Sequence, residues 1–263
     1  MKIAVIGSRG FVGSNVARHL SNSNTVVSVT RNTLDLLDPI AVQDFLKKEM
    51  FDVVVNCAAV MTDNNLIHDA RNNLGMFINF YQNSNYFGKF INTGSGAEFD
   101  RTLDINSTLE SQLFSRMPKD SYGWGQNIKS RLCYDKKDFY TIRIFNCFGA
   151  GESDTRIFPR LLREGSLEIS NDRYFDYFSI QDLNKVIDHC IEYTWLNKDI
   201  NAVYEQKYKI SEVVDKFCRV NQLEPNFKVI STSNNNYTGS GHLLSTMNIK
   251  LDGLEKGLED YLK

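Results

Sequence analysis

The chain has 263 residues, of which 42% are hydrophobic and 24% charged, and its formal net charge at pH 7 is −2. This length and mixture are typical of a globular protein with a sizeable core, and the small negative charge excludes the broad basic surface of a nucleic-acid-binding protein. No stretch approaches the roughly 20 apolar residues that a membrane-spanning helix needs. We therefore expect a cytoplasmic protein whose partners are neither nucleic acid nor membrane.

The cysteines and histidines show no metal-site spacing. The five cysteines and four histidines are scattered along the chain, with no CxxC or HxxxH pair. Thiols in this arrangement fit a reducing compartment better than a disulfide framework. The sequence therefore predicts no metal site.

The first half of the chain alternates short β-rich runs with longer helical patterns. Candidate strands lie at 2–7, 25–29, 52–58, 89–94 and 139–145, and amphipathic segments that predict helices lie at 11–21, 39–50, 65–86 and 121–136. Continuous apolar strands separated by helices indicate a parallel sheet covered on both faces. We therefore predict an α/β fold in which residues 1–150, together with about 177–197, form a doubly wound Rossmann domain.

After about residue 150 this rhythm changes. The patterns predict a short helix at 157–165, a strand at 166–170, helices at 181–196 and 209–221, and a turn-rich surface loop at 231–242. We expect residues 151–263 to form mostly a smaller α/β lobe.

The stretch "GSRGFVGS" directly follows the first predicted strand and precedes the first predicted helix. Gly7, Gly10 and Gly13 allow a tight turn and a close approach of backbone to a pyrophosphate. The next helix points its positive N-terminus at the phosphates. A merely structural glycine turn is the alternative, but the position of the motif in the chain favours dinucleotide binding.

The end of the second strand indicates which dinucleotide binds. A ribose 2′-hydroxyl requires an acidic acceptor there, whereas a 2′-phosphate requires arginine. Arg31 lies at this place, and Arg9 of the glycine loop can close on the same phosphate. Two solvated arginines are the alternative, and Asp35 keeps NAD open. We expect NADP to be the cofactor.

Several motifs together resemble the NAD-dependent epimerase/dehydratase (nucleotide-sugar) branch of the extended short-chain dehydrogenase/reductase family. "GSRGFVGS" is similar to its glycine loop, "VVNCAA" to its fourth-strand turn, "RIFNCFGAGE" to its Arg-x-x-Asn-x-Tyr-Gly segment and "FDYFSIQDL" to its Asp-Leu turn. Asn73 stands where a structural helix asparagine is expected, and "TRNTLDLLDPIAVQDFL" is particularly similar to GDP-fucose synthases, which use NADPH. The resemblance covers nearly the whole chain. It implies cofactor contacts at Gly7, Arg9, Gly10, Phe11, Val12, Gly13, Arg31, Ala58, Ala59, Tyr122 and Gln126.

The family's proton-transfer set is a Ser or Thr after the fifth strand and a Tyr-x-x-x-Lys on the next helix. Ser95 in "NTGSGAEF" and Tyr122 in "SYGWGQNIKS" match the serine and the tyrosine. The resemblance implies that Tyr122 exchanges a proton with the sugar oxygen and that Ser95 holds this oxygen, while hydride moves between nicotinamide and sugar carbon. A strand-end hydroxyl and a packed aromatic are the alternatives for these two residues.

The lysine of this set is missing, because Gln126 lies four residues after Tyr122. Positions 122, 126 and 129 share one helix face, although Lys129 lies about 10 Å along the axis from Tyr122. Gln126 can hydrogen-bond the nicotinamide ribose but carries no charge that would lower the tyrosine pKa. The expected catalytic set is Tyr122, Ser95, Gln126 and Lys129.

Further departures from the family narrow the chemistry. Gly96 and Ala97 stand where 4,6-dehydratases carry an Asp-Glu pair. Ala97 and Arg156 stand where GDP-fucose synthases carry the cysteine and histidine of epimerisation. These departures favour a reductase or 4-epimerase over a dehydratase or 3,5-epimerase.

On the substrate side, the resemblance implies a sugar nucleotide held by basic and aromatic residues of the smaller lobe. It also implies a homodimer in which the helices near 65–86 and 121–136 pair across a two-fold axis. The implied substrate contacts are Ser95, Asn146, Arg156, Arg160, Arg163 and Arg173.

Two functions stay open on the sequence alone. One is an NADP(H)-dependent reductase or epimerase of a nucleotide-activated sugar, which the retention of Ser95 and Tyr122 favours. The other is a non-catalytic dinucleotide-binding protein, such as a redox sensor or assembly partner, which the missing lysine favours.

Overall fold

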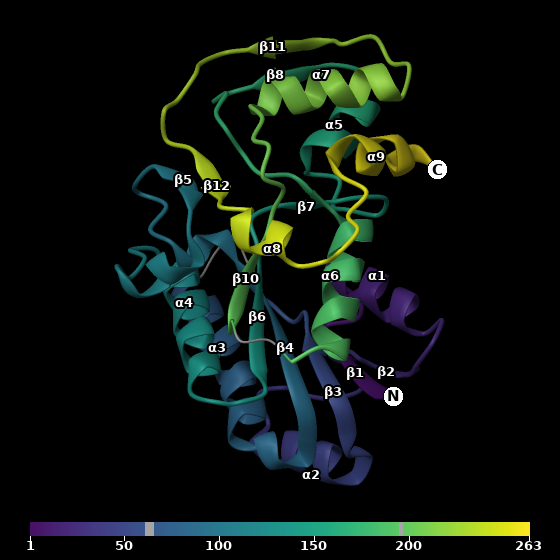
Figure 1. Ribbon diagram of the computed structural model, residues 1–263, viewed down its shortest axis with the longest axis vertical. Coiled ribbons are helices and arrows are strands. Elements are labelled where there is room, and N and C mark those ends of the chain that lie inside the picture. Colours follow the sequence, from purple (N-terminus) through teal and green to yellow (C-terminus); the bar gives the residue numbers. More distant parts are fainter. Residues whose placement is uncertain (61–65, 195–196) are drawn as a thin grey trace. The chain divides into compact units, whose positions relative to one another are not determined.

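The computed structural model describes residues 1–60, 66–194 and 197–263 and divides the chain into two compact units (Figure 1). The first unit comprises Met1–Thr102, Ser111–Arg143 and Ile187–Ile200. The second comprises Leu103–Glu110, Ile144–Val186 and Asn201–Lys263. Neither unit is one continuous stretch of chain.

A parallel sheet forms the centre of the first unit. In the part of the chain that the structure describes, its six strands have the order β10-β6-β4-β3-β1-β2. Because β1 pairs in parallel with β2 on one side and with β3 on the other, the strand order reverses at β1. In open α/β sheets such a reversal marks where ligands bind. The strands are β1 (Lys2–Ile6), β2 (Thr25–Val29), β3 (Phe51–Asn56), β4 (Phe87–Ser95), β6 (Phe139–Ile144) and β10 (Asp199–Ala202).

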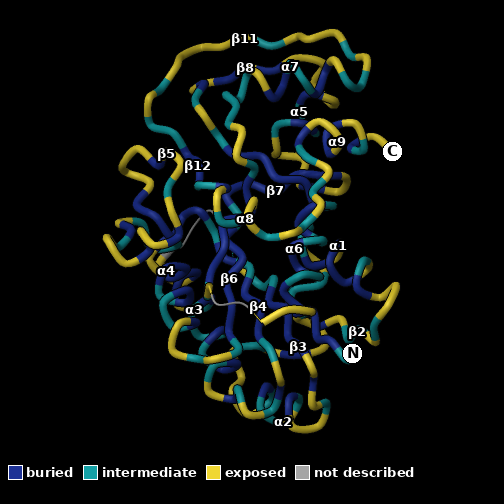
Figure 2. Tube along the Cα trace, viewed as in Figure 1, coloured by how far each residue is buried: buried dark blue, intermediate teal, exposed yellow. Residues whose placement is uncertain are grey.

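Helices cover both faces of this sheet. Ala4, Val54 and Phe90 point into one hydrophobic core with residues of three helices, α2, α3 and α4. Their strand neighbours Ile3 and Val55 are also fully buried, and Figure 2 shows β3 and β6 buried along most of their length. The predicted doubly wound α/β fold is therefore confirmed. The helices are α1 (Phe11–Leu20), α2 (Pro39–Glu49), α3 (Leu66–Gln82), α4 (Ser121–Tyr134) and α6 (Ile180–Glu192).

The ends of α2 show how local sequence sets these elements. The Asp38 carboxylate accepts hydrogen bonds from the backbone N–H of Ile40 and Ala41, and Pro39 occupies the first helical position. An acidic cap followed by proline is a strong helix start. Met50 ends the helix in the left-handed conformation.

The second unit has shorter elements around a core of its own. Stacked rings of Phe158 and Phe217 lie 4.4 Å apart, and the Tyr261 ring packs edge-on against both. Three parallel strand pairs join β5 to β12, β7 to β9 and β8 to β11. The elements are β5 (Ile105–Thr108), β7 (Cys147–Phe148), α5 (Ile157–Glu164), β8 (Leu167–Ile169), β9 (Phe178–Ser179), α7 (Ile210–Val220), β11 (Phe227–Val229), β12 (Tyr237–Gly239), α8 (His242–Thr246) and α9 (Leu254–Glu259).

The predicted strands and helices of the first 150 residues each match an observed element to within a few residues. The surface loop predicted at 231–242 is wrong at Tyr237–Gly239, which form the buried strand β12 beside β5. The sequence did not predict β5 or β10, because strands of three or four residues are too short to show a period. Residue 65 of one predicted helix and residues 195–196 of another lie outside the described residues. No described helix is long and apolar enough to cross a membrane.

Candidate active site

The glycine loop between β1 and α1 is packed so closely that two of its positions accept only glycine. Gly7 has a φ of +77°, and a Cβ there would lie 2.8 Å from Ala58 Cα. A Cβ on Gly13 would lie 2.3 Å from the carbonyl oxygen of Gly7. No side chain caps α1, and its first turn holds no acidic residue. This close backbone at a helix N-terminus suits the phosphates of a dinucleotide.

A cavity of about 400 Å³ opens beside this loop, at the carboxyl ends of β1, β2 and β3. Its lining includes the exposed side chains of Arg9 and Arg31. Six of the predicted cofactor contacts line it, namely Gly7, Arg9, Gly10, Arg31, Ala58 and Ala59, whereas Phe11, Val12 and Gly13 lie in the first turn of α1. The two arginines and the glycine backbone fit a phosphorylated dinucleotide.

The lining of this cavity also includes residues that the sequence did not indicate. Cys57 and Val60 follow β3, and Met76 comes from α3, where no local signal marks it. Asn73, also of α3, holds the wall in place. Its Oδ1 accepts a hydrogen bond from the Val60 N–H at 2.6 Å and its Nδ2 donates to the Val60 carbonyl at 2.8 Å.

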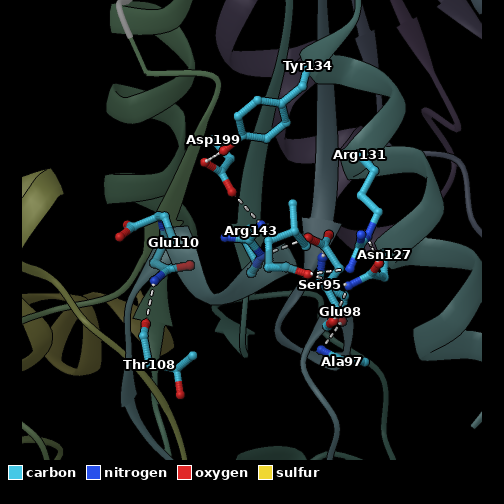
Figure 3. Close-up of polar contacts among 12 residues, drawn as sticks. Ser95, Ala97, Glu98, Thr108, Glu110, Asn127, Arg131, Tyr134, Arg143 and Asp199 are labelled. Atoms are coloured by element: carbon cyan, nitrogen blue, oxygen red, sulfur yellow. Dashed lines mark hydrogen bonds and ion pairs between the residues drawn. The ribbon is translucent and has the colours of Figure 1, made fainter. Parts of the chain in front are cut away.

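Ser95 is the last residue of β4 and the cap of the short helix η2 (Gly96–Glu98). Its Oγ accepts a hydrogen bond from the Ala97 N–H at 3.2 Å, and its own N–H donates to Glu98 Oε1 at 2.9 Å (Figure 3). These two bonds fix the Ser95 backbone at the end of the strand. The hydroxyl hydrogen is left to donate elsewhere.

The first turn of α4 places Tyr122 against η2. The Asp120 carboxylate caps the helix by accepting from the Gly123 N–H at 2.8 Å. A Cβ on Gly123 would lie 2.3 Å from the Ala97 carbonyl oxygen, so only glycine lets the helix approach so closely. The structure thus brings Ser95 and Tyr122 together, although they come from different elements.

The environment of Tyr122 favours its protonated form. Burial raises the pKa of the half-buried phenol, and the nearby negative charge of Glu98 raises it further. Hydrogen bonding with Ser95, the charge of Arg101 and hydrogen bonding with Gln126 each lower the pKa but do not offset the rise. The phenol is therefore protonated at neutral pH and can donate its proton.

Gln126 and Lys129 are both buried in α4 but lie in different surroundings. The Gln126 side chain is only 2% exposed, and its Oε1 has no hydrogen-bond partner among the described residues. Burial lowers the pKa of Lys129 to about 8, although the negative charge of Glu98 favours the ammonium. The negative charge of Glu98 acts on both groups, because it raises the pKa of the Tyr122 phenol and favours the ammonium of Lys129.

The second unit contains a cavity of about 310 Å³. Asn146, Arg156 and Arg160 of the predicted substrate contacts line it, together with Glu152 and Phe175. The Arg156 guanidinium donates a hydrogen bond to Asn146 Oδ1 and forms an ion pair with Glu152 at 3.5 Å. Such a cavity offers a cation, amides and an aromatic ring to a polar ligand.

Two other predicted substrate contacts lie outside the lining of this cavity. Arg163 is exposed and donates to the Asp154 carbonyl and to Glu164. Arg173 donates to the Asn235 carbonyl at 2.9 Å. Each of these arginines is therefore engaged within the second unit.

A glycine loop beside a cavity with two arginines, and a serine–tyrosine pair after β4, are the features that the sequence resemblance implies. The family model "NAD dependent epimerase/dehydratase family" matches residues 3–233. The chain belongs to this family. Membership places the chain among NAD(P)-dependent enzymes and confirms the resemblance predicted from the motifs.

Individual relatives of the epimerase/dehydratase family are distant in sequence. GDP-6-deoxy-D-talose 4-dehydrogenase of Aggregatibacter actinomycetemcomitans is 22% identical over 249 residues, which are 87% of this chain and 83% of that protein. The NADP-bound GDP-mannoheptose C4 reductase of Campylobacter jejuni has a TM-score of 0.81 at 22% identity, covering 99% of this chain and 96% of that one. An NADP-bound GDP-L-fucose synthetase of Naegleria fowleri has a TM-score of 0.83 at 15% identity, covering 99% and 91%.

Proposed function

We propose that the chain is an NADP(H)-dependent reductase or epimerase that acts on a nucleotide-activated keto sugar. The observation that carries this proposal is the placement of Ser95 beside Tyr122, with a phenol that stays protonated. Family membership and the cofactor named for several relatives, NADP, support it. We assign cofactor binding to the first unit and substrate binding mostly to the second.

In this mechanism the Ser95 hydroxyl donates a hydrogen bond to the keto oxygen of the sugar. Tyr122 donates its proton to the same oxygen as the carbonyl is reduced, and it recovers the proton from solvent. A bound NADPH supplies the hydride. A protonated phenol is the acid that this direction requires.

In the family, the lysine holds the nicotinamide ribose and lowers the pKa of the tyrosine. Gln126 takes over the first of these two tasks. Its buried Oε1, which has no partner among the described residues, can accept a hydrogen bond from a hydroxyl of the nicotinamide ribose. A buried acceptor without a partner costs free energy, so a ligand hydroxyl that satisfies it gains affinity. The neutral amide cannot take over the second task, which is to stabilise the phenolate.

On the substrate side we assign the cavity of the second unit to the nucleotide diphosphate. Arg156 and Arg160 supply the positive charge and Phe175 an aromatic face. Arg163 and Arg173 are proposed to contact the substrate after leaving their present partners.

A cytoplasmic location and a homodimer through α3 and α4 belong to the same proposal. Light scattering that gives only the monomer mass of 30.1 kDa would count against the dimer.

A second candidate function is a non-catalytic NADP-binding protein, which the replacement of lysine by Gln126 favours. Two measurements separate the candidates. A panel of GDP-, UDP- and dTDP-keto sugars is offered with NADPH while absorbance at 340 nm is followed, and the melting temperature is recorded with each ligand. The proposal expects at least one sugar nucleotide both to raise the melting temperature and to consume NADPH. Binding of NADPH without any turnover favours the second candidate.

A further inference from the structure

The turn after Ser95 holds a buried carboxylate that the proposed proton transfer does not use. Glu98 ends η2, and its side chain is fully buried. Its Oε1 accepts a hydrogen bond from the Ser95 N–H at 2.9 Å, and its Oε2 accepts one from Arg143 Nε at 2.7 Å. Both oxygens are therefore held inside the protein. Glu98 consequently does not replace the acid–base pair that dehydratases carry directly after the serine.

Arg143, on β6, is fully buried and paired on two sides (Figure 3). Its Nη2 donates to Asp199 Oδ2 at 2.6 Å, while the Tyr134 hydroxyl donates to Asp199 Oδ1 at 2.6 Å. Buried charges are tolerated when they are paired and hydrogen-bonded, so Glu98, Arg143 and Asp199 stabilise one another. Tyr134 is the last residue of α4, the helix that carries Tyr122 in its first turn.

The same turn is fixed to α4 by its backbone. Asn127 Nδ2 donates to the Glu98 carbonyl at 2.8 Å. Arg131 holds the Asn127 side chain, because its Nε donates to Asn127 Oδ1 at 2.6 Å. The Glu98 side chain also touches the strand, since a Cβ on Gly94 would lie 2.2 Å from Glu98 Oε1. Strand end, turn and helix therefore meet at this one residue.

We propose that Glu98 is a positioning residue for the Ser95–Tyr122 pair. Its carboxylate fixes the Ser95 backbone, and Arg143 holds that carboxylate in place from β6. The inference rests on the proposed function for its catalytic meaning. One consequence can be measured without turnover, because the charge of Glu98 affects the pKa of the Tyr122 phenol.

The charged and titratable groups around Glu98 come from two elements. Tyr122, Lys129 and Cys133 face it from α4, and Arg143 faces it from β6. A carboxylate next to a phenol disfavours the phenolate, so removal of its charge lowers the phenol pKa. If Glu98 only stabilised the fold, removal of its charge would change the Tyr122 pKa no more than removal of the charge of another buried carboxylate.

The test compares Glu98→Gln with Asp182→Asn. Asp182 is also a fully buried carboxylate that accepts backbone N–H bonds, from Asp252 and Gly253, but it lies in the second unit. The phenol of Tyr122 is titrated by NMR with ¹³Cζ-labelled tyrosine and assigned by its loss in Tyr122→Phe. NADPH affinity and the kcat and KM of sugar reduction are measured on the same samples.

In Glu98→Gln the Tyr122 pKa should fall by on the order of one unit. The kcat of reduction should fall at least about tenfold through misplacement of Ser95, with NADPH affinity unchanged. Asp182→Asn should change neither the phenol titration nor NADPH affinity. A folded Glu98→Gln protein with wild-type phenol titration and wild-type kcat would overturn the inference, as would equal changes in the control.

Two further arms keep the test decisive. If Glu98→Gln does not fold, Arg143→Lys takes its place, because it keeps a cation but loses the contact with both Glu98 and Asp199. It should shift the pKa of the Tyr122 phenol and lower kcat, each by less than the change expected for Glu98→Gln. Unchanged values in a folded Arg143→Lys protein would then count against the inference. If the wild type reduces no sugar nucleotide, the proposed function fails, whereas the phenol titration still decides whether Glu98 acts on Tyr122.

Discussion

Gln126 lies one helical turn after Tyr122 on α4, and its amide favours the ionised phenol only by hydrogen bonding, without a charge. Burial and the charge of Glu98 outweigh this help, so the pKa of Tyr122 stays above its usual value of 10. A protonated phenol suits the reduction of a keto sugar, whereas oxidation of the alcohol requires the phenolate. Under the proposed function we therefore expect a site biased toward reduction, with alcohol oxidation that accelerates as the pH rises.

Gln126→Lys should restore the missing charge. A cation about 4 Å from the phenol at an effective dielectric near 20 is worth roughly 4 kcal/mol, or about 3 pK units at most. The pH profile of alcohol oxidation should move to lower pH, and its rate near pH 7 should increase. Steady-state rates of NADP⁺ reduction between pH 6 and about 10 check this expectation.

Gln126→Met is the matched control for that variant, because it has similar length and no charge. It should leave the oxidation profile at high pH and weaken NADPH binding, since it removes the amide that is proposed to hold the ribose. If Gln126→Lys and Gln126→Met shift the profile equally, the charge is not what the site lacks.

Lys129→Met should stabilise the fold near neutral pH. Burial lowers the folded-state pKa of Lys129 to about 8, below its ordinary value of 10.5. The charged lysine is therefore disfavoured in the folded state below pH 8, and this penalty disappears between pH 8 and 10.5 as the folded protein releases the proton. The gain should be of the order of 3 kcal/mol at pH 7 and near zero above about pH 10.5.

Urea unfolding of Lys129→Met and wild type at pH 7 and pH 10 measures this difference. A loss of stability at pH 7 would show that the ammonium is well paired in the folded protein. The oxidation rate of the same variant tests the role expected from the sequence. If Lys129→Met slows oxidation as much as Tyr122→Phe, the lysine has taken over the missing charge.

Much of the fold and part of the site follow from local sequence. The glycine loop was recognised from the spacing of its glycines directly after the first predicted strand. The structure gives the reason for this spacing, because Gly7 and Gly13 have no room for a Cβ. Ser95 and Tyr122 were found through a family motif with a fixed place after a strand and on a helix. Long apolar strands predicted the sheet, whereas the three-residue strand β12 gave no such pattern.

The buried charges behind the site could not be predicted from the sequence. Glu98 and Arg143 are 45 positions apart and Arg143 and Asp199 are 56 apart. Glutamate, arginine and aspartate are most often solvated, so nothing local indicates that these three lie in the core. Met76, which lines the cavity beside the glycine loop, was missed for a similar reason, because a methionine on a helix is usually an ordinary core residue.

Arg31→Ala should weaken NADPH binding and leave NADH binding nearly unchanged. Arg31 is exposed and lines the cavity after β2, where the 2′-phosphate is expected. Loss of a charge-assisted hydrogen bond should cost about 1.5–3 kcal/mol. Calorimetric titration of both cofactors measures the change, with Arg219→Ala, an exposed arginine of the second unit, as control. Tighter binding of NADH than of NADPH by the wild type would sink the assignment.

The proposed function depends on proton transfer by Tyr122. The most direct measurement is the rate of single-turnover NADPH oxidation in Tyr122→Phe, with a keto-sugar nucleotide that the wild type reduces and with NADPH affinity measured in parallel. Loss of the hydroxyl removes the acid but leaves the ring and the cavity beside the glycine loop in place. We therefore expect a rate lower by at least about 10²-fold, with NADPH affinity within about twofold of wild type. A Tyr122→Phe protein that binds NADPH and reduces the sugar at the wild-type rate would contradict it.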